Sequence, residues 1–156
     1  MATMNLDHIN PFLMASTKIL SEMCFVDAKI GKPYIKSPVY MDNTLVILIG
    51  ITGEMKGQVI ISFEHNVACD IASKMIMMPI TEMDEFAQSA ICELGNMIMG
   101  NTAIVFSSKG IEIDITPPTV GNGTMSFTNN FAQNVCIPLE YDVDKKIEIN
   151  IAIKGD

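Results

Sequence analysis

Two polar residues, Glu93 and Asn96, lie three positions apart in a stretch that should form one long helix. At 3.6 residues per turn, side chains at this spacing are neighbours on the helix surface. A carboxylate attracts a cation, whereas a carboxamide both donates and accepts hydrogen bonds without being ionised. The pair could therefore dock on another molecule and orient a water molecule, chemistry that acts by positioning and does not need a strong base.

Ser89 and Gly100 fall on the same side of this helix, and we call Ser89, Glu93, Asn96 and Gly100 the polar strip. Gly95 and Gly100 lie in the helix interior, where each costs about 1 kcal/mol relative to alanine. At Gly100, the missing side chain would let another backbone approach closely. The alternative interpretation is an ordinary outer helix face that is only solvated.

The helix that must position the strip is predicted over residues 82–107, with Thr81 as its cap and Asp84 completing a capping box. A separate apolar arc of the same helix should face the core and consists of Phe86, Ala90, Leu94, Met97, Ile98 and Val105.

Two further helices precede it. Asn10 is a suitable cap and Pro11 suits the first helical position, so the first helix should run from there to about Phe25. The second helix is predicted over residues 65–78 and should end at Pro79.

Five stretches have strand character. Residues 44–51 and 58–63 are apolar and flank glycines, which predicts a hairpin. The remaining three are residues 111–115, 135–141 and 146–154.

The other connections are less regular. Pro138 predicts a bulge or an edge position for the strand that contains it, because proline cannot donate a ladder hydrogen bond. Residues 29–38 read as a loop or an irregular strand, and residues 116–130 as a mobile loop. The predicted order α-β-β-α-α-β-β-β indicates an α+β fold, with a largely antiparallel sheet packed with long helices, and residues 1–156 fit a single domain.

Composition excludes several classes of protein. The net charge of −8 argues against a nucleic-acid surface. The longest apolar run, residues 44–51, is too short to cross a bilayer, and residues 1–10 lack the pattern of a signal peptide. We therefore expect a cytoplasmic protein with no membrane insertion, no metal site of its own at His8 or His65, and reduced, mostly buried cysteines.

The motif Ser89-x-x-x-Glu93-x-x-Asn96, followed by Pro117-Pro118, resembles the signature of the CheC/CheX/FliY chemotaxis phosphatases. The opening Asn10-Pro11-Phe12 and the stretch from Glu93 to Asn101 are similar to CheX in particular. The order of the elements matches as well, so the resemblance covers nearly the whole chain.

The resemblance implies a bacterial hydrolase that removes the aspartyl phosphate of a CheY-type response regulator and so ends a chemotaxis or two-component signal. Asn96 would position the attacking water, and Glu93 would pair with the active-site lysine of the partner. The implied partner contacts are Ser89, Gly100, Pro117 and Pro118.

The resemblance also implies that the partner supplies Mg²⁺ and that this chain holds no cofactor. It implies a homodimer formed by joining strand edges, for which the isoleucine-lined residues 146–154 are a candidate. Two other functions stay open: a non-catalytic module that binds a response regulator, and a flagellar-switch-like component. The presence of both Glu93 and Asn96 favours the phosphatase.

Overall fold

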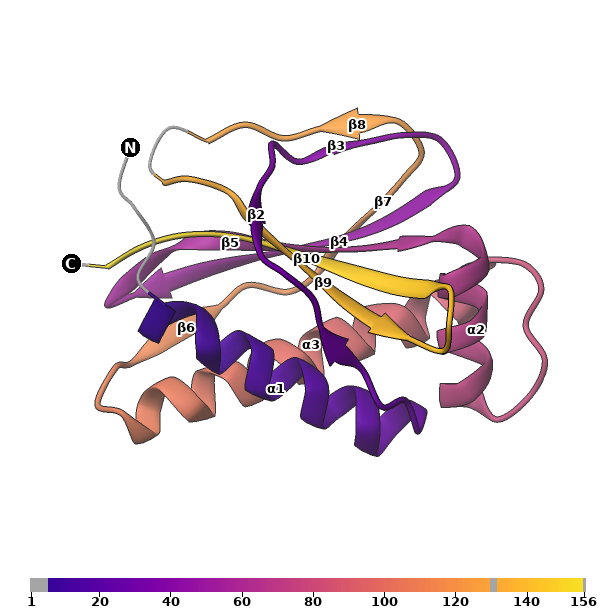
Figure 1. Cartoon of the computed structure of the whole chain (residues 1–156), viewed down its shortest axis with the longest axis horizontal. Coiled ribbons are helices and arrows are strands. Elements are labelled where there is room, and N and C mark those ends of the chain that lie inside the picture. The colour runs from indigo at the N-terminus through magenta and orange to yellow at the C-terminus, as the bar shows by residue number, and fades with distance from the viewer. Residues whose placement is uncertain (1–5, 130–131, 156) are drawn as a thin grey trace.

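The computed structural model describes residues 6–129 and 132–155, and places three helices on one face of a sheet (Figure 1). The helices are α1 (Leu6–Cys24), α2 (His65–Ile76) and α3 (Glu85–Ser108). The strands are β1 (Lys29–Ile30), β2 (Tyr34–Ile35), β3 (Val39–Tyr40), β4 (Thr44–Gly53), β5 (Met55–Glu64), β6 (Ile113–Ile115), β7 (Thr119–Asn122), β8 (Met125–Ser126), β9 (Val135–Tyr141) and β10 (Lys145–Gly155).

The main sheet has the order β1-β9-β10-β5-β4-β6, with β2 also pairing with β9 and β7 with β4. Every pair of described strands is antiparallel. The predicted α+β class and the predicted hairpin, formed by β4 and β5, are confirmed.

The two faces of the sheet differ because side chains alternate along each strand. Isoleucines such as Ile47, Ile61 and Ile149 point to the helices and form the main core. On the other face, Val46 and Ile60 form a small cluster with Tyr40 of β3, and β3 pairs with β8 in a ribbon above the sheet (Figure 1). The helices α1 and α3 therefore lie over the more apolar face.

Strand β10 lies in the centre of the sheet, which corrects the prediction that residues 146–154 form an exposed edge. It pairs with β5 on one side and with β9 on the other. The alternating isoleucines correctly predicted which side of the strand faces the core, but alternation does not show which strands lie next to it.

Of the two alternatives predicted from Pro138, a bulge or an edge position, the edge is wrong, because β9 lies between β1 and β10 and its outer pairing is interrupted at Pro138. Strand β1 pairs with Leu139 and Glu140, whereas β2 pairs with Val135 and Cys136, so Pro138 falls between them. Its carbonyl accepts a hydrogen bond from the amide of Gly31 at 2.8 Å. The missing N–H is thus placed where the outer pairing is already broken.

Residues 116–130, predicted as a mobile loop, contain two short strands that the sequence did not indicate. These are β7, which pairs with β4, and β8, which pairs with β3. Both strands are too short to give a periodic sequence signal, and Asn130 lies outside the described residues.

Helix α1 begins earlier than predicted. Pro11 lies inside the helix and not at its first position. It sits in the second turn, where its missing N–H removes one helical hydrogen bond. The helix ends at Cys24, near the predicted position, because Phe25 has a φ of 57° and leaves the right-handed region.

Helix α3 begins later than predicted, at Glu85. Its cap is Asp84 and not Thr81, since the Asp84 side chain accepts a hydrogen bond from the amide of Ala87 at 2.9 Å. Helix α2 also ends slightly early, at Ile76, where Met77 adopts the left-handed conformation.

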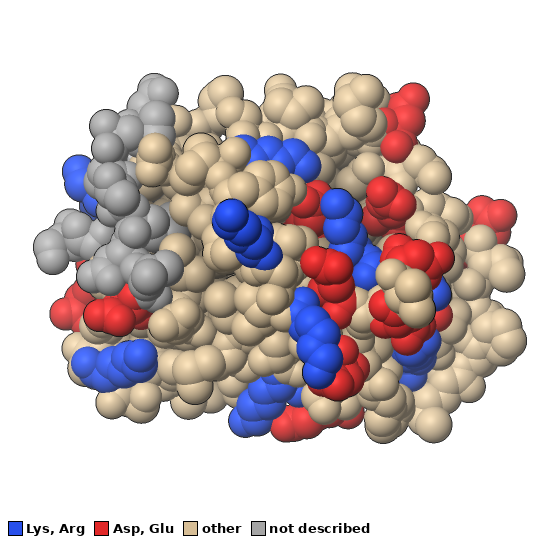
Figure 2. Space-filling view, viewed as in Figure 1, with Lys and Arg blue, Asp and Glu red and all other residues tan. Residues whose placement is uncertain are grey.

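Acidic and basic side chains are interspersed on the broad face shown in Figure 2, and no large basic patch appears there. Among the described residues, no helix is long and apolar enough to cross a membrane.

Candidate active site on helix α3

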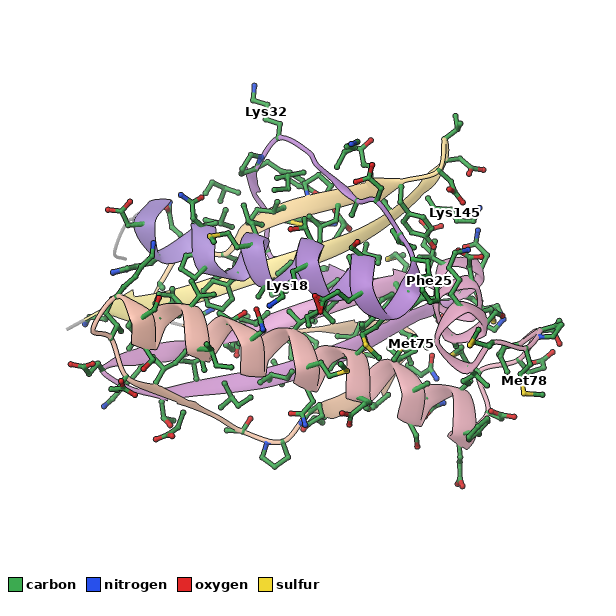
Figure 3. The ribbon with its side chains drawn as sticks, turned by 90° about the horizontal axis from the view of Figure 1, so that it is seen from below. Lys18, Phe25, Lys32, Met75, Met78 and Lys145 are labelled. Carbon is green, nitrogen blue, oxygen red and sulfur yellow. The ribbon has the colours of Figure 1, made fainter. Side chains whose placement is uncertain are left out.

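Helices α3 and α1 lie side by side over the same face of the sheet, as the view from the helix side shows (Figure 3). Gly95 faces the sheet, and a methyl group at its position would lie 3.1 Å from Cγ2 of Ile47. This close approach explains why a glycine occupies the middle of the helix, and it fixes which side of α3 points outward.

The core side of α3 differs from the predicted apolar arc. Leu94 and Ile98 are buried as predicted, but Phe86 is 62% exposed. The buried side chains are centred on a different line, formed by Ala87, Ile91, Leu94, Gly95, Ile98, Met99, Thr102 and Phe106. The predicted arc included Phe86 but omitted the large apolar residues Ile91, Met99 and Phe106, so it was rotated toward the polar strip.

The polar strip lies on the outer side of α3, as predicted. Ser89, Glu93 and Asn96 are exposed, and Gly100 is partly exposed, with no atom beyond the adjacent helix backbone within 4 Å of the position that a Cβ would occupy. Within the described part of the chain, the Glu93 and Asn96 side chains have no hydrogen-bond or ion-pair partner. Both groups are therefore free to contact a second molecule.

A groove of about 510 Å³ runs along the strip and separates α3 from the chain around β7. Its lining consists of Glu85, Gln88, Ser89, Cys92, Glu93, Asn96, Pro118 and Val120. Pro118 is half-buried and forms part of the wall, whereas Pro117 is exposed and lies outside the lining. The structure thus brings one of the two predicted prolines to the strip.

The chemistry of the groove is that of an acidic, hydrogen-bonding wall. Glu85 and Glu93 are its two charged residues, and no Lys or Arg is among the residues that line it. The Gln88 amide is held by a 3.1 Å hydrogen bond from its nitrogen to the carbonyl of Met83. Such a groove is suited to a cationic group of a visitor, with Asn96 beside it to orient water.

Cys92 also lines the groove. Burial raises the pKa of its thiol, which favours the neutral form and makes it a poor nucleophile. The cysteines that the structure describes are free, and Cys24, Cys69 and Cys136 are buried. No group of three or more His, Cys, Asp and Glu side chains suited to a metal ion occurs among residues 6–129 and 132–155.

Sequence reasoning missed three residues of the groove: Glu85, Gln88 and Val120. Glu85 and Gln88 lie on α3 beside the strip, and the helical wheel could have indicated them once the side facing β7 was known. Val120 depends on β7, which the sequence did not reveal.

Comparison with known proteins identifies the family. The family described as "Chemotaxis phosphatase CheX" matches residues 45–140. The chain is also 31% identical over 148 residues to the CheY-P phosphatase CheX of Thermotoga maritima, covering 94% of this chain and 96% of that protein. The chain belongs to the CheX family.

Solved structures agree with the CheX fold. A CheC-like superfamily protein from Shewanella superposes with a TM-score of 0.86 at 30% identity, covering 97% of this chain and 100% of that one. The Borrelia burgdorferi protein in a CheX-CheY-BeF3-Mg²⁺ complex superposes with a TM-score of 0.83 at 30% identity and the same coverage. The fold expected for a CheX-like protein is therefore confirmed.

Proposed function

We propose that this CheX-family protein hydrolyses the aspartyl phosphate of a CheY-type response regulator, with Glu93 and Asn96 as the working residues. The observation that carries the proposal is the exposure of both side chains, next to each other on α3 and along an open groove. A relative is named a CheY-P phosphatase, and a similar CheX has been crystallised with CheY, which supports this choice of partner.

The reaction needs little covalent chemistry from this chain. Water attacks phosphorus, the bond from phosphorus to the partner's aspartyl oxygen breaks, and inorganic phosphate and a free carboxylate result. Phosphoryl transfer depends mainly on positioning and on stabilising charge. The Asn96 carbonyl oxygen would accept a hydrogen bond from the attacking water and align it, since an amide is not itself a strong base.

Glu93 would act one helical turn away, with its Cβ about 5–6 Å from that of Asn96. Its carboxylate would pair with the lysine beside the partner's phosphorylated aspartate and so fix the docking. Ser89, Gly100 and Pro118 would contact the partner around this pair, with Pro117 at the outer rim. Mg²⁺ would come with the partner, where it neutralises charge on the phosphoryl oxygens, as the Mg²⁺ in the CheX-CheY complex suggests.

The decisive variant is Asn96→Ala. We expect phosphate release from an acylphosphate-charged response regulator to slow by about 100-fold or more, because the water loses its orienting group. Binding of the partner should remain, since Glu93 and the surrounding surface are intact. The measurement is single-turnover phosphate release over a panel of charged receivers, alongside equilibrium binding.

Asn101→Ala is the matched control, because Asn101 lies on the same helix but is turned by about 140° from Asn96. It should hydrolyse at the wild-type rate. If Asn96→Ala also hydrolyses at the wild-type rate, the catalytic assignment is wrong. If neither the wild type nor a variant accelerates hydrolysis but binding persists, the chain is a non-catalytic binding module.

We further propose that residues 1–156 work as a single phosphatase domain in the bacterial cytoplasm, supported by one main core shared by all three helices and the large sheet. A homodimer is proposed as well. The strands at the ends of the sheet, β1 and β6, are available for pairing with a second copy.

A further inference from the structure

Two large apolar side chains on α3 point outward in line with Glu93. Phe86 lies seven residues before Glu93 and Ile104 eleven residues after it, so both fall within about 20° of Glu93 around the helix axis. Phe86 is 62% exposed and Ile104 is 66% exposed. We call Phe86 and Ile104 the flanking pair.

The fold does not require the flanking pair. Neither residue belongs to a hydrophobic core cluster of the described chain. In the view from the helix side, no other ribbon passes in front of α3 (Figure 3). Single exposed apolar residues are common on protein surfaces, but here two lie on one line with the proposed catalytic glutamate between them.

One position between the two residues carries no side chain. Gly100 lies on this side of the helix, and apart from the adjacent helix backbone no atom lies within 4 Å of the place where its Cβ would be. The line from Phe86 to Ile104 is about 27 Å long at 1.5 Å per residue. That length suits the footprint of one small globular partner, which typically covers about 800 Å².

We propose that the flanking pair anchors the phosphorylated response regulator, with one apolar contact on each side of the Glu93–Asn96 pair. This inference rests on the proposed function and adds the surface that holds the partner. The partner would present a cationic group between two apolar patches. Helix α3 carries Glu85 and Glu93 and has no Lys or Arg, so its charge complements such a surface.

The same charges disfavour a second copy of this chain as the occupant. The midpoint of the flanking pair is position 95, close to Glu93. A two-fold contact between two α3 helices centred there would place the two Glu93 carboxylates within about one turn of each other. Like charges brought together at an interface oppose association.

Anchors of this kind act on the lifetime of the complex and not on the chemical step. Truncating a large apolar side chain that an interface buries speeds dissociation, while the geometry at the reacting atoms is retained. The two functions of α3 should therefore separate: Asn96 governs turnover, and the flanking pair governs binding.

The test uses Phe86→Ala and Ile104→Ala in the full chain, with a charged CheY-type receiver as substrate. We expect KM to rise about 10-fold in each variant, with kcat within about twofold of the wild type. Ile35→Ala is the matched control: Ile35 is also 62% exposed but belongs to β2, away from α3. Its KM should not change, and because all three side chains are exposed, the variants should melt like the wild type.

The outcomes are distinguishable. If KM is unchanged in both variants while Asn96→Ala abolishes turnover, the anchoring role is wrong and the proposed function stands. If the variants change the molar mass in light scattering and leave KM unchanged, the flanking pair joins two copies of this chain and the inference is overturned. If the wild type neither binds nor hydrolyses any receiver, both proposals fall together.

Discussion

Gly100 occupies a helical position at which a methyl group would meet no atom beyond the adjacent helix backbone. Gly100→Ala should therefore raise the free energy of unfolding by about 1 kcal/mol, which is the helix-propensity difference. The same methyl group would stand on the outer line of α3 and hold a partner's backbone away. We expect a more stable protein with a higher KM, measured by denaturant unfolding and by steady-state phosphate release.

Gly95→Ala is the comparison within the same helix. Its methyl group would press on Ile47 at 3.1 Å, so the gain in helix propensity should be reduced or reversed by crowding. A Gly100→Ala variant that is more stable but has an unchanged KM would remove Gly100 from the proposed docking surface.

At the residue scale, the polar strip was predicted correctly because Ser89, Glu93 and Asn96 repeat at helical spacing. Phe86 was misplaced because hydrophobicity was taken to mean burial. A large apolar side chain can lie on the outer face of a helix as well as on the buried face, and the sequence does not distinguish the two. The contact of Ile47 with Gly95 in the structure shows which side of α3 faces the sheet. The exposed phenylalanine is instead the basis of the docking inference.

At the element scale, Asp70 ties α2 to the sheet. Its carboxylate accepts hydrogen bonds from Lys74 Nζ at 2.9 Å and from Tyr141 Oη of β9 at 2.8 Å. Burial alone would raise the pKa of Asp70, but these hydrogen bonds and the nearby lysines outweigh it and hold the pKa below its usual value. The ionised form is therefore more stable in the folded protein than in the unfolded chain.

Asp70→Asn should lower the free energy of unfolding by about 1–2 kcal/mol at neutral pH, since a charged acceptor is lost. The depressed pKa sets the sign of the pH dependence. The stabilisation by the ionised Asp70 carboxylate is fully present above the pKa of the unfolded chain, about 4, and disappears as the pH falls through the lower pKa of the folded protein. Urea unfolding at several pH values should show the two proteins converging in acid.

Asp27→Asn is the control for this prediction, because the Asp27–Lys29 pair is largely exposed, at 87% and 77% of the side chains. Such pairs contribute little. Equal losses in Asp27→Asn and Asp70→Asn would show that the carboxylate of Asp70 has no special role in joining α2 to β9.

The long elements were predictable because their patterns extend over many residues, such as the alternating isoleucines of β10. The helix ends were less predictable, because capping depends on local geometry: Asp84 and not Thr81 bonds the first turn of α3. The short strands β2 and β7 each pair with a longer strand, β9 and β4, and their own sequences are too short to show a pattern.

At the scale of the whole molecule, the proposed homodimer should have twice the mass of one chain in size-exclusion chromatography with light scattering. The terminal strands β1 and β6 have only two and three residues, so pairing between them would form few hydrogen bonds. We therefore expect the dimer to dissociate on dilution. A single-chain mass at all working concentrations would contradict the dimer and leave the phosphatase proposal intact.

The order of the strands could not be predicted from the chain. Alternation along 146–154 indicated a strand with one buried face, yet an edge strand and a central strand can share that pattern. Pairing between β10 and β5 joins residues that are far apart in sequence, and a periodic pattern carries no record of such contacts.

The central place of β10 bears on how the protein is made. While a ribosome is still translating residues 145–155, the facing sides of β5 and β9 have no strand between them, and the isoleucines that close the core have not yet emerged. The backbone N–H and C=O groups of β5 and β9 that face β10 thus lack hydrogen-bond partners until nearly all of the described sequence has been made. A chaperone that shields these groups during synthesis should raise the yield of native protein.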